Sequence, residues 1–340
     1  MAKRRGSLSW AKLFNRNVSA LTRLTMRAGA RTVGQAARPL LAKRTEPAGA
    51  GDWLLGMVLG PTGARRFRVF RPAGVQFGER LALIVMLHGC SQDAKSFAAS
   101  TRMNVVAARE RFLVLYPEQD RMSNPQACWN WFDTKSGRAY GEAASIMLAI
   151  DQVCALYSAD RDRVAVAGLS AGASMAALLV TRYPERFKAV TMHSGIAPGT
   201  AHSTMSAVGA MSGRRSTKPL RAVPAAMATS WPPLMVIHGG ADAVVSATHG
   251  RAAAQVWADA SDARAGVERG IRRGKRYPMT VTDFKRRGIT RARLVQVQRL
   301  GHAWSGGAAS EHFSDVNGPD ASRMVWGFSA KQFAAVPRTR

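Results

Sequence analysis

The sequence predicts a three-layer α/β fold built around a mostly parallel central sheet. Two observations lead to this fold class. Short, uniformly apolar runs recur from residue 53 onward, and longer stretches with helical periodicity separate them. The run Leu81–Leu87 contains seven apolar residues in a row, which is too short for most helices and is typical of a strand buried on both faces. Strands that alternate with helices predict a parallel sheet covered by helices on both faces.

The same patterns predict the individual elements. Buried strands are expected at residues 81–87, 112–116, 164–167, 189–192 and 234–237. Helices are expected over residues 140–156, 171–182 and 250–260, and a final helix from Asp320 to Phe333. Residues 66–72 and the hairpin-like segment 277–300 fit antiparallel or edge strands.

Composition excludes several classes of protein. The chain has 340 residues, of which 46% are apolar, so it can bury a substantial core and is not disordered throughout. No apolar run approaches the roughly 20 residues that span a bilayer, and three cysteines exclude a disulfide-rich scaffold. The net charge of +28 favours anionic partners. Because no nucleic-acid-reading motif accompanies the basic residues, nucleic-acid binding is not expected to be the main role.

The basic residues concentrate in two stretches. Residues 1–44 hold eleven Lys or Arg and no Asp or Glu, and a second basic stretch covers residues 264–293. On a helical wheel, residues 8–28 place Trp10 and Leu13 on one face and Lys12 and Arg16 on the other. We therefore expect residues 8–28 to attach to an anionic or apolar surface, such as a membrane. Packing of this apolar face on the protein's own domain is the alternative.

The chain is expected to contain three parts. Residues 1–51 form the basic amphipathic segment with its linker, residues 52–335 form one α/β domain that carries the site, and residues 336–340 form a tail. The linker is expected at residues 45–52, where Gly and Pro recur. Arginines interrupt every apolar run of the first segment, so no cleavable secretory signal is evident. This predicts a cytoplasmic protein or one bound at a membrane or granule surface, although transit peptides share the composition.

Polar and glycine residues follow four of the predicted strands, where open α/β sheets bind ligands. The four strand ends read His88-Gly89-Cys90, Gly168-Leu169-Ser170-Ala171-Gly172, His238-Gly239-Gly240-Ala241-Asp242 and Gly301-His302-Ala303-Trp304. The second of them is a G-x-S-x-G turn between a strand and a helix of small residues. Such a turn exposes its serine at a helix N-terminus, where negative charge is stabilised. The sequence therefore predicts Ser170 as a catalytic nucleophile.

A serine nucleophile needs a base, and the base needs a carboxylate to orient it. Where the serine sits on such a turn, the chain order is serine, acid, histidine. Asp242 follows the strand that ends at His238, and His302 follows the strand at residues 294–300. We therefore predict Asp242 as the acid and His302 as the base. The remaining histidines at 193, 202, 249 and 312 do not follow a late strand, and we expect them to be packing or surface residues.

Acyl transfer through a serine also requires two N–H donors for the oxyanion of the tetrahedral intermediate. One donor comes from the residue after the nucleophile, which is Ala171, and the other from the loop after an early strand. That loop is His88-Gly89-Cys90, and the backbone N–H of Cys90 is the predicted second donor. Because the donors are backbone amides, the Cys90 side chain is not required for this role. We expect no metal ion and no cofactor.

Together these residues resemble the polyhydroxybutyrate (PHB) depolymerase-like esterases of the α/β-hydrolase superfamily. The resemblance covers roughly residues 52–333. It is carried by His88-Gly89-Cys90-Ser91-Gln92, Cys128-Trp129-Asn130-Trp131-Phe132, Gly168-Leu169-Ser170-Ala171-Gly172, His238-Gly239-Gly240-Ala241-Asp242 and Gly301-His302-Ala303-Trp304-Ser305-Gly306-Gly307. It implies a Ser170–Asp242–His302 triad that hydrolyses short-chain 3-hydroxyalkanoate polyester or oligoester. Feruloyl and acetyl-xylan esterases belong to the same family, so a carbohydrate esterase is the alternative.

The resemblance has two further consequences. Family members with paired cysteines at these motifs suggest a Cys90–Cys128 disulfide, which leaves Cys154 free in a helix. Extracellular depolymerases of this kind carry a cleavable signal and often a polymer-binding domain, and neither is evident here, which argues against attack on crystalline polymer. A polyester granule joins the membrane as a surface for residues 8–28. A surface-binding protein with an inert hydrolase body is disfavoured, because all three triad residues occur in order.

Three tryptophans lie in the motifs nearest the proposed site. They are Trp129, Trp131 and Trp304. An aromatic wall offers apolar area for an aliphatic chain punctuated by carbonyls, with an N–H at its edge. We therefore predict that these three residues bind the substrate. The alternative is that they belong to the core.

Overall fold

In the computed structural model, the structure describes residues 47–201, 204–211 and 231–335. The unit Glu46–Arg340 contains all of them. The surface-binding segment predicted at residues 8–28 and the tail at residues 336–340 lie outside the described residues. The first described strand, β1, begins at Gly51, so the linker predicted at residues 45–52 overlaps the start of the sheet.

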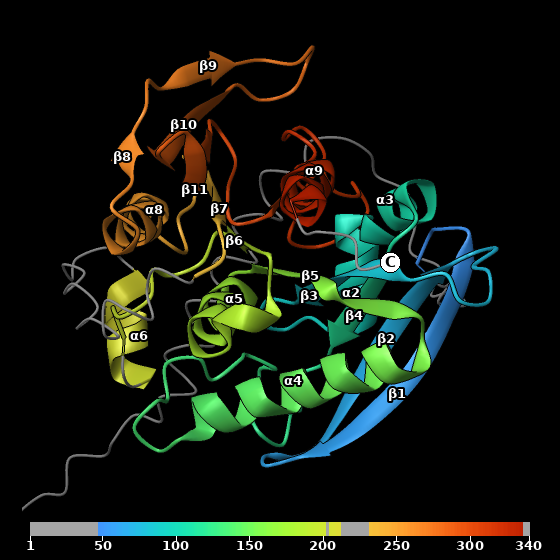
Figure 1. The fold of residues 1–340 in the computed structure, drawn as a ribbon. Helices are drawn as coiled ribbons and strands as arrows, with labels where there is room; N and C mark the ends of the chain where they lie inside the picture. Colours follow the sequence, from blue (N-terminus) through green and yellow to red (C-terminus); the bar gives the residue numbers. More distant parts are fainter. Residues whose placement is uncertain (1–46, 202–203, 212–230, 336–340) are drawn as a thin grey trace, which may run out of the picture. The chain divides into compact units, whose positions relative to one another are not determined.

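The described residues form an 11-stranded sheet with helices on both faces (Figure 1). Its centre is a run of parallel strands in the order β4-β3-β5-β6-β7-β11. These strands are β3 (Leu81–Leu87), β4 (Leu113–Pro117), β5 (Ala159–Leu169), β6 (Ala189–His193), β7 (Leu234–Gly239) and β11 (Ile289–Val297). The arrangement confirms the predicted three-layer α/β fold with a mostly parallel sheet.

Antiparallel strands complete both sides of the sheet. On one side β1 (Gly51–Gly60) pairs with β2 (Gly63–Pro72), and β2 pairs with β4. On the other side β10 (Met279–Arg286) pairs with β11, and the short strands β8 (Arg264–Ala265) and β9 (Arg269–Ile271) pair with β10. The predicted hairpin at residues 277–300 is thus present. However, β11 also pairs in parallel with β7, so it lies inside the sheet and its carboxyl end joins the same rim as the other parallel strands.

The helices divide between two faces, each with its own buried cluster (Figure 1). On one face lie α4 (Arg138–Leu156), α5 (Ala171–Arg182), α6 (Thr204–Met211) and α8 (Thr248–Ala260). On the other face lie α2 (Ala94–Thr101), α3 (Met103–Glu110) and α9 (Ala321–Ala334). Among the described residues, no helix has the length and hydropathy needed to cross a membrane.

Strand β3 shows why the central runs are uniformly apolar. Leu83, Val85 and Leu87 belong to the cluster that includes α4 and α5. The alternate residues Ile84 and Met86 belong to the cluster on the opposite face. Both sides of the strand are therefore dry, so both sets of alternate positions must be apolar.

Two parts of the fold have no counterpart among the predicted elements. On β1, Leu55, Met57 and Leu59 are 59%, 57% and 78% exposed, and they alternate with small or apolar residues, so no clear strand pattern arises. Helices α2 and α3 contain only eight residues each, which is shorter than a periodicity argument can detect. The capping box at α2 between Asp93 and Ser96 is the one local signal that marks it.

Two glycines set how closely α5 follows the sheet. A Cβ atom at residue 172 would lie 2.1 Å from the carbonyl oxygen of Leu87, and one at residue 168 would lie 2.3 Å from the backbone of Gly172. Both distances are far below van der Waals contact, and the neighbouring atoms belong to the backbone and cannot rotate away. Only glycine fits at these two positions.

We expect Gly172→Ala to lower the free energy of unfolding by about 1–3 kcal/mol, because the added methyl group overlaps the carbonyl oxygen of Leu87. Gly327→Ala in α9 is the matched control, since no atom lies within 4 Å of its Cβ position and alanine is the better helix former by up to about 1 kcal/mol. Urea denaturation measures both effects. Equal stability of the two variants would contradict the close-approach argument.

Candidate active site

Ser170 lies at the sharp turn between β5 and α5. Its backbone has φ +56° and ψ −120°, a conformation that residues other than glycine rarely adopt. The N–H of Ser170 donates a hydrogen bond of 2.9 Å to the carbonyl oxygen of His193, at the end of β6. Strained turns of this kind present a nucleophilic serine at the carboxyl edge of an α/β sheet. Gly168 and Gly172 leave the room that this turn needs.

His302 contacts both of the other residues predicted for the triad. Its Nε2 lies 2.9 Å from the Oγ of Ser170, and its Nδ1 lies 2.9 Å from the Oδ2 of Asp242. The carboxylate can only accept, so the Nδ1–H donates to Asp242 and the Ser170 hydroxyl donates to Nε2. The structure therefore brings Ser170, Asp242 and His302 together in one row.

Asp242 is held in a turn tied to the end of β11. Its Oδ1 accepts hydrogen bonds from the N–H groups of Val244 (3.0 Å) and Val245 (2.9 Å). The N–H of Ala241 donates to the carbonyl oxygen of Leu300 at 3.0 Å. Burial alone would raise the pKa of Asp242, but the hydrogen bonds from His302 and Val245 outweigh it and hold the pKa below its ordinary value. The carboxylate is therefore charged and fixed in orientation.

The two predicted oxyanion donors belong to residues near Ser170. Ala171 is the first residue of α5, where helix N–H groups have no partner within the helix. Gly89, next to Cys90, lies so close that a Cβ atom there would be 3.6 Å from the Cβ of Ser170. In the part of the chain that the structure describes, no hydrogen bond engages the N–H of Cys90 or of Ala171. Both donors are thus free to bind a developing oxyanion.

A disulfide joins Cys90 to Cys128, with the two Cα atoms 4.3 Å apart. This is the pairing implied by the family resemblance. It links the loop after β3 to the Cys128-Trp129-Asn130-Trp131-Phe132 segment. Cys154 is free and buried in α4.

The structure corrects the substrate-binding prediction for two of the three tryptophans. Trp129 and Trp304 are fully buried. The indole N–H of Trp129 donates to the carbonyl oxygen of His88 at 3.1 Å, and that of Trp304 donates to the Oγ of Ser322 at 3.1 Å. Neither ring has exposed surface that a substrate could contact. They pack inside the protein, against the loop after β3 and the start of α9 respectively. Trp131 retains 8% exposure and packs edge-on against Phe132.

His193, which we expected to be a packing or surface residue, is buried and also connects two loops of the site. Its Nε2 accepts the N–H of Ser305 at 3.1 Å, and its backbone carbonyl accepts the N–H of Ser170. Its ring stacks on Trp304 with the ring centroids 5.0 Å apart. His193 therefore ties the turn of Ser170 to the loop of His302. Its position directly after a predicted strand was the available signal.

Two histidines near the rim are buried in the neutral form. His193 is fully buried, and burial, with repulsion from His238 and His302, lowers its pKa to about 3. His88 is also fully buried, and burial lowers its pKa to about 4. The Nε2 of His88 accepts the N–H of Gln119 at 3.0 Å, which requires an unprotonated nitrogen at that position.

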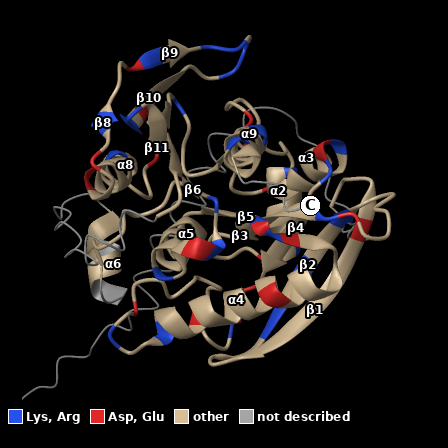
Figure 2. Cartoon of the chain, viewed as in Figure 1, with Lys and Arg blue, Asp and Glu red and all other residues tan. Residues whose placement is uncertain are grey.

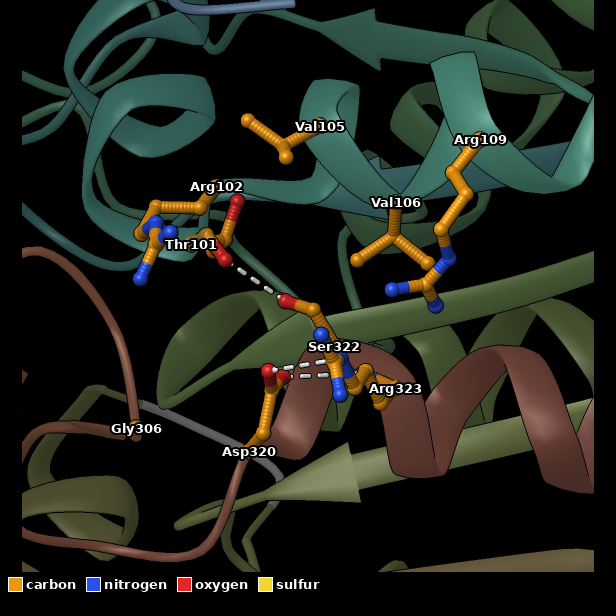
Figure 3. Close-up of a pocket in the computed structure, with 9 residues that line it drawn as sticks. All are labelled: Thr101, Arg102, Val105, Val106, Arg109, Gly306, Asp320, Ser322 and Arg323. Carbon is orange, nitrogen blue, oxygen red and sulfur yellow. Dashed lines mark hydrogen bonds and ion pairs between the residues drawn. The ribbon is translucent and has the colours of Figure 1, made fainter.

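A separate hollow opens between α3 and the start of α9 (Figure 3). It is lined by Thr101, Arg102, Val105, Val106, Arg109, Gly306, Asp320, Ser322 and Arg323. None of the predicted site residues lines it, although Gly306 follows the loop of His302. Asp320 caps α9 by accepting the N–H of Arg323 at 3.0 Å.

No group of three or more His, Cys, Asp or Glu that could hold a metal ion occurs within the described ranges.

We expect the fold to lose stability when the pH falls below about 6.5. A histidine in the unfolded chain has a pKa near 6.5. In the folded protein, His88 binds a proton only near pH 4 and His193 only near pH 3, so between these values and pH 6.5 the unfolded chain binds more protons. The unfolding free energy therefore falls with decreasing pH, by up to about 1.4 kcal/mol per pH unit for each histidine. Urea denaturation between pH 7 and pH 4.5 measures this slope.

His193→Gln tests the assignment of this slope. The side-chain oxygen of glutamine can still accept the N–H of Ser305 and does not titrate. The number of protons taken up on unfolding is therefore expected to fall by up to about one, which lowers the slope of unfolding free energy against pH. His312→Gln is the matched control, because His312 is exposed. An unchanged slope in His193→Gln would contradict the argument.

Comparison with known proteins gives the family. The family model described as "Esterase PHB depolymerase" matches residues 66–269. The chain is 38% identical over 131 residues to poly(3-hydroxyalkanoate) depolymerase C of Paucimonas lemoignei, covering 38% of this chain and 31% of that protein. It is 37% identical over 118 residues to feruloyl esterase B of Neurospora crassa, covering 34% of this chain and 39% of that protein. The chain thus spans about a third of the length of these curated relatives.

Solved structures support the fold. An acetyl xylan esterase from Aspergillus awamori matches with a TM-score of 0.63 and 19% identity over 81% of this chain and 99% of that chain. The acylaminoacyl peptidase of Pyrococcus horikoshii matches with a TM-score of 0.56 and 13% identity over 86% of this chain and 44% of that chain. These identities establish the α/β-hydrolase fold alone. With a family match that covers more than half of its 340 residues, the chain belongs to the PHB depolymerase esterase family.

Proposed function

We propose that the chain is a serine carboxylesterase in which Ser170 is the nucleophile, His302 the general base and Asp242 the orienting acid. The observation that carries the proposal is the pair of 2.9 Å hydrogen bonds that link the three side chains. A serine hydroxyl is a weak nucleophile unless a base takes its proton. The buried carboxylate of Asp242 fixes the imidazole tautomer whose Nε2 accepts that proton.

The proposed reaction proceeds through an acyl-enzyme. The Oγ of Ser170 attacks the ester carbonyl carbon while its proton moves to the Nε2 of His302. The C–O bond to the alcohol then breaks, and the imidazolium returns the proton to the leaving alkoxide. Water then attacks the acyl carbon while one of its protons moves to the Nε2 of His302. The bond between the acyl carbon and the Oγ of Ser170 breaks as the imidazolium returns the proton to Oγ, which releases the acid and restores Ser170. Asp242 stabilises the imidazolium in both halves.

The oxyanion of each tetrahedral intermediate is proposed to bind the N–H groups of Ala171 and Cys90. The N-terminal end of α5 adds the positive end of its helix dipole. The loop that carries Cys90 is held on both sides, because the N–H of Gly89 donates to the Oε1 of Gln92 (3.0 Å) and the N–H of Ser91 donates to the carbonyl of Gln126 (2.7 Å). A fixed donor costs no reorganisation during the reaction.

The proposed substrate is a short-chain 3-hydroxyalkanoate oligoester or polyester. The family match and the relative named poly(3-hydroxyalkanoate) depolymerase C support this class. A feruloyl or acetyl-xylan esterase is the second candidate, favoured by the similarity to feruloyl esterase B at nearly the same identity. Trp131, which keeps 8% of its surface exposed, is the aromatic side chain proposed to contact either acyl group.

We expect Ser170→Ala to lower kcat/KM for p-nitrophenyl butyrate by about 10⁴-fold or more, because it removes the hydroxyl that the Nε2 of His302 contacts. Its thermal midpoint should match that of the wild type, since only the Oγ atom is removed. Full activity in this variant would overturn the triad. Within the same assay series, kcat/KM for 3-hydroxybutyrate oligomers, methyl ferulate and acetylated xylan separates the two candidate substrates, with the oligomers expected to be favoured.

We also propose that residues 8–28 attach the protein to an anionic membrane or to a polyester granule. The support is the sequence alone, in which apolar and basic side chains fall on opposite faces of a helical wheel. A second cationic region competes for the same role. Figure 2 shows Lys and Arg along β8, β9 and the following loop, where Arg272, Arg273 and Lys275 are exposed.

Deletion of residues 1–44 is expected to abolish co-sedimentation with phosphatidylglycerol vesicles or with native polyester granules. Hydrolysis of soluble p-nitrophenyl butyrate should stay within twofold of the full chain. The triple variant Arg272→Gln, Arg273→Gln, Lys275→Gln is the matched control and should still co-sediment. Sedimentation that survives the deletion but fails in the triple variant would move the role to the second region.

A further inference from the structure

Glu142 is a fully buried carboxylate in the second turn of α4. Its Oε1 accepts hydrogen bonds from the Nε2 of Gln119 and from the Nδ2 of Asn130, both at 2.7 Å. Its Oε2 accepts the backbone N–H of Asn130 at 2.9 Å. All three partners are N–H donors, so the site is built for a group that only accepts. The proposed ester chemistry makes no use of this residue.

Gln119, one of the two residues that donate to Glu142, also contacts the loop that carries Cys90. The backbone N–H of Gln119 donates to the Nε2 of His88, two residues before Cys90, at 3.0 Å. The side-chain amide of Gln119 also donates to the carbonyl oxygen of Cys128 at 2.9 Å. Cys128 is bonded covalently to Cys90. The carboxylate therefore reaches this loop by two routes, one through His88 and one through the disulfide.

Asn130 supplies a third connection. It holds the segment 128–132 on Glu142 through both its backbone and its side chain. Within that segment, the indole N–H of Trp129 donates to the carbonyl oxygen of His88 at 3.1 Å. Removal of one acceptor oxygen from Glu142 would leave a buried N–H without a partner, whichever oxygen is replaced. An unpaired buried N–H is costly in free energy. We therefore expect the segment 128–132 to shift, together with the His88 carbonyl oxygen that it contacts.

The buried charge of Glu142 is balanced through Gln119. The guanidinium of Arg65 is 1% exposed and donates through Nη1 to the Oε1 of Gln119. The amide of Gln119 thus accepts from the cation and donates to the anion. Burial lowers the pKa of Arg65, while the charge of Glu142 raises it. We expect this buried pair of charges to fix geometry more than it adds stability.

From this geometry we infer that Glu142 is a positioning residue for the oxyanion side of the site. It holds the loop of residues 88–92 and the segment 128–132 in register, so that the N–H of Cys90 points at the place where the oxyanion forms. The inference rests on the proposed serine esterase function. It assigns Glu142 no contact with substrate and no proton transfer.

Glu142→Gln is the direct test, because it keeps the size of the side chain and replaces one acceptor with a donor. Complete loss of an oxyanion donor costs about 10²–10³ in kcat, and a displaced donor should cost less. We expect kcat for p-nitrophenyl butyrate to fall about 10–100-fold, with KM within about threefold. Binding of a butyl boronic acid, which forms a tetrahedral anion on Ser170, should weaken in parallel with kcat/KM.

Asp151→Asn is the matched control. It makes the same acid-to-amide change on the same helix, but at a half-buried residue that pairs with Arg161 and Arg186. Its kcat and its boronic acid affinity should equal those of the wild type. If Glu142→Gln fails to fold, Asn130→Ala removes the Nδ2 bond to Glu142, together with the bond that the Oδ1 of Asn130 accepts from the Nδ2 of Asn124. It keeps the backbone N–H bond to Glu142 and should lower kcat in the same direction by a smaller factor.

The outcomes separate the inference from the proposed function. If the wild type is active, Ser170→Ala is inactive and Glu142→Gln keeps full kcat, the positioning role is overturned and the esterase proposal stands. A lower thermal midpoint with unchanged kcat and unchanged boronic acid affinity also overturns the positioning role, because it assigns Glu142 to stability alone. If Ser170→Ala keeps wild-type activity, the esterase proposal fails and the inference fails with it.

Discussion

His302 forms hydrogen bonds with two residues that are 60 and 132 positions away in the sequence. These contacts depend on the parallel register of the sheet, because β5, β7 and β11 all end at one rim. A strand that entered the sheet in the opposite direction would carry its loop to the far rim, about the length of a strand away. The position of β11 between β7 and β10 is therefore what allows His302 to reach Ser170 and Asp242.

Two buried polar side chains, those of His193 and Glu142, connect the loops at this rim. His193 connects the turn of Ser170 to the loop of His302 through its carbonyl oxygen and its Nε2. Glu142 connects the loop of Cys90 to the disulfide-bonded segment through Gln119 and Asn130. Both side chains are fully buried. His193 accepts N–H groups through its Nε2 and its carbonyl oxygen, and Glu142 accepts N–H groups through both carboxylate oxygens. Burial of an acceptor is costly unless every donor finds it, so each arrangement tolerates little displacement of the loops.

The two groups differ in the charge they bury. His193 avoids the cost of a buried charge by remaining neutral, which is why its pKa falls to about 3. Glu142 faces Arg65 across the amide of Gln119. The link between the turn of Ser170 and the loop of His302 thus uses a histidine that stays neutral. The oxyanion side depends on an acid that accepts three N–H bonds.

From the sequence alone we could predict the parallel strands of the sheet, the turn of Ser170 and the chain order of the three predicted triad residues, because apolar runs and glycine turns are local signals. It also implied the Cys90–Cys128 pair through the family resemblance. Which aromatic rings are accessible could not be predicted in this way: Trp129 and Trp304 lie in motifs beside the site, yet both are fully buried. Burial depends on neighbours from distant segments, such as Ser322 behind Trp304. For the same reason, the connection of Glu142 to Gln119 and Asn130 has no local signature and emerges only when α4 packs beneath the two loops.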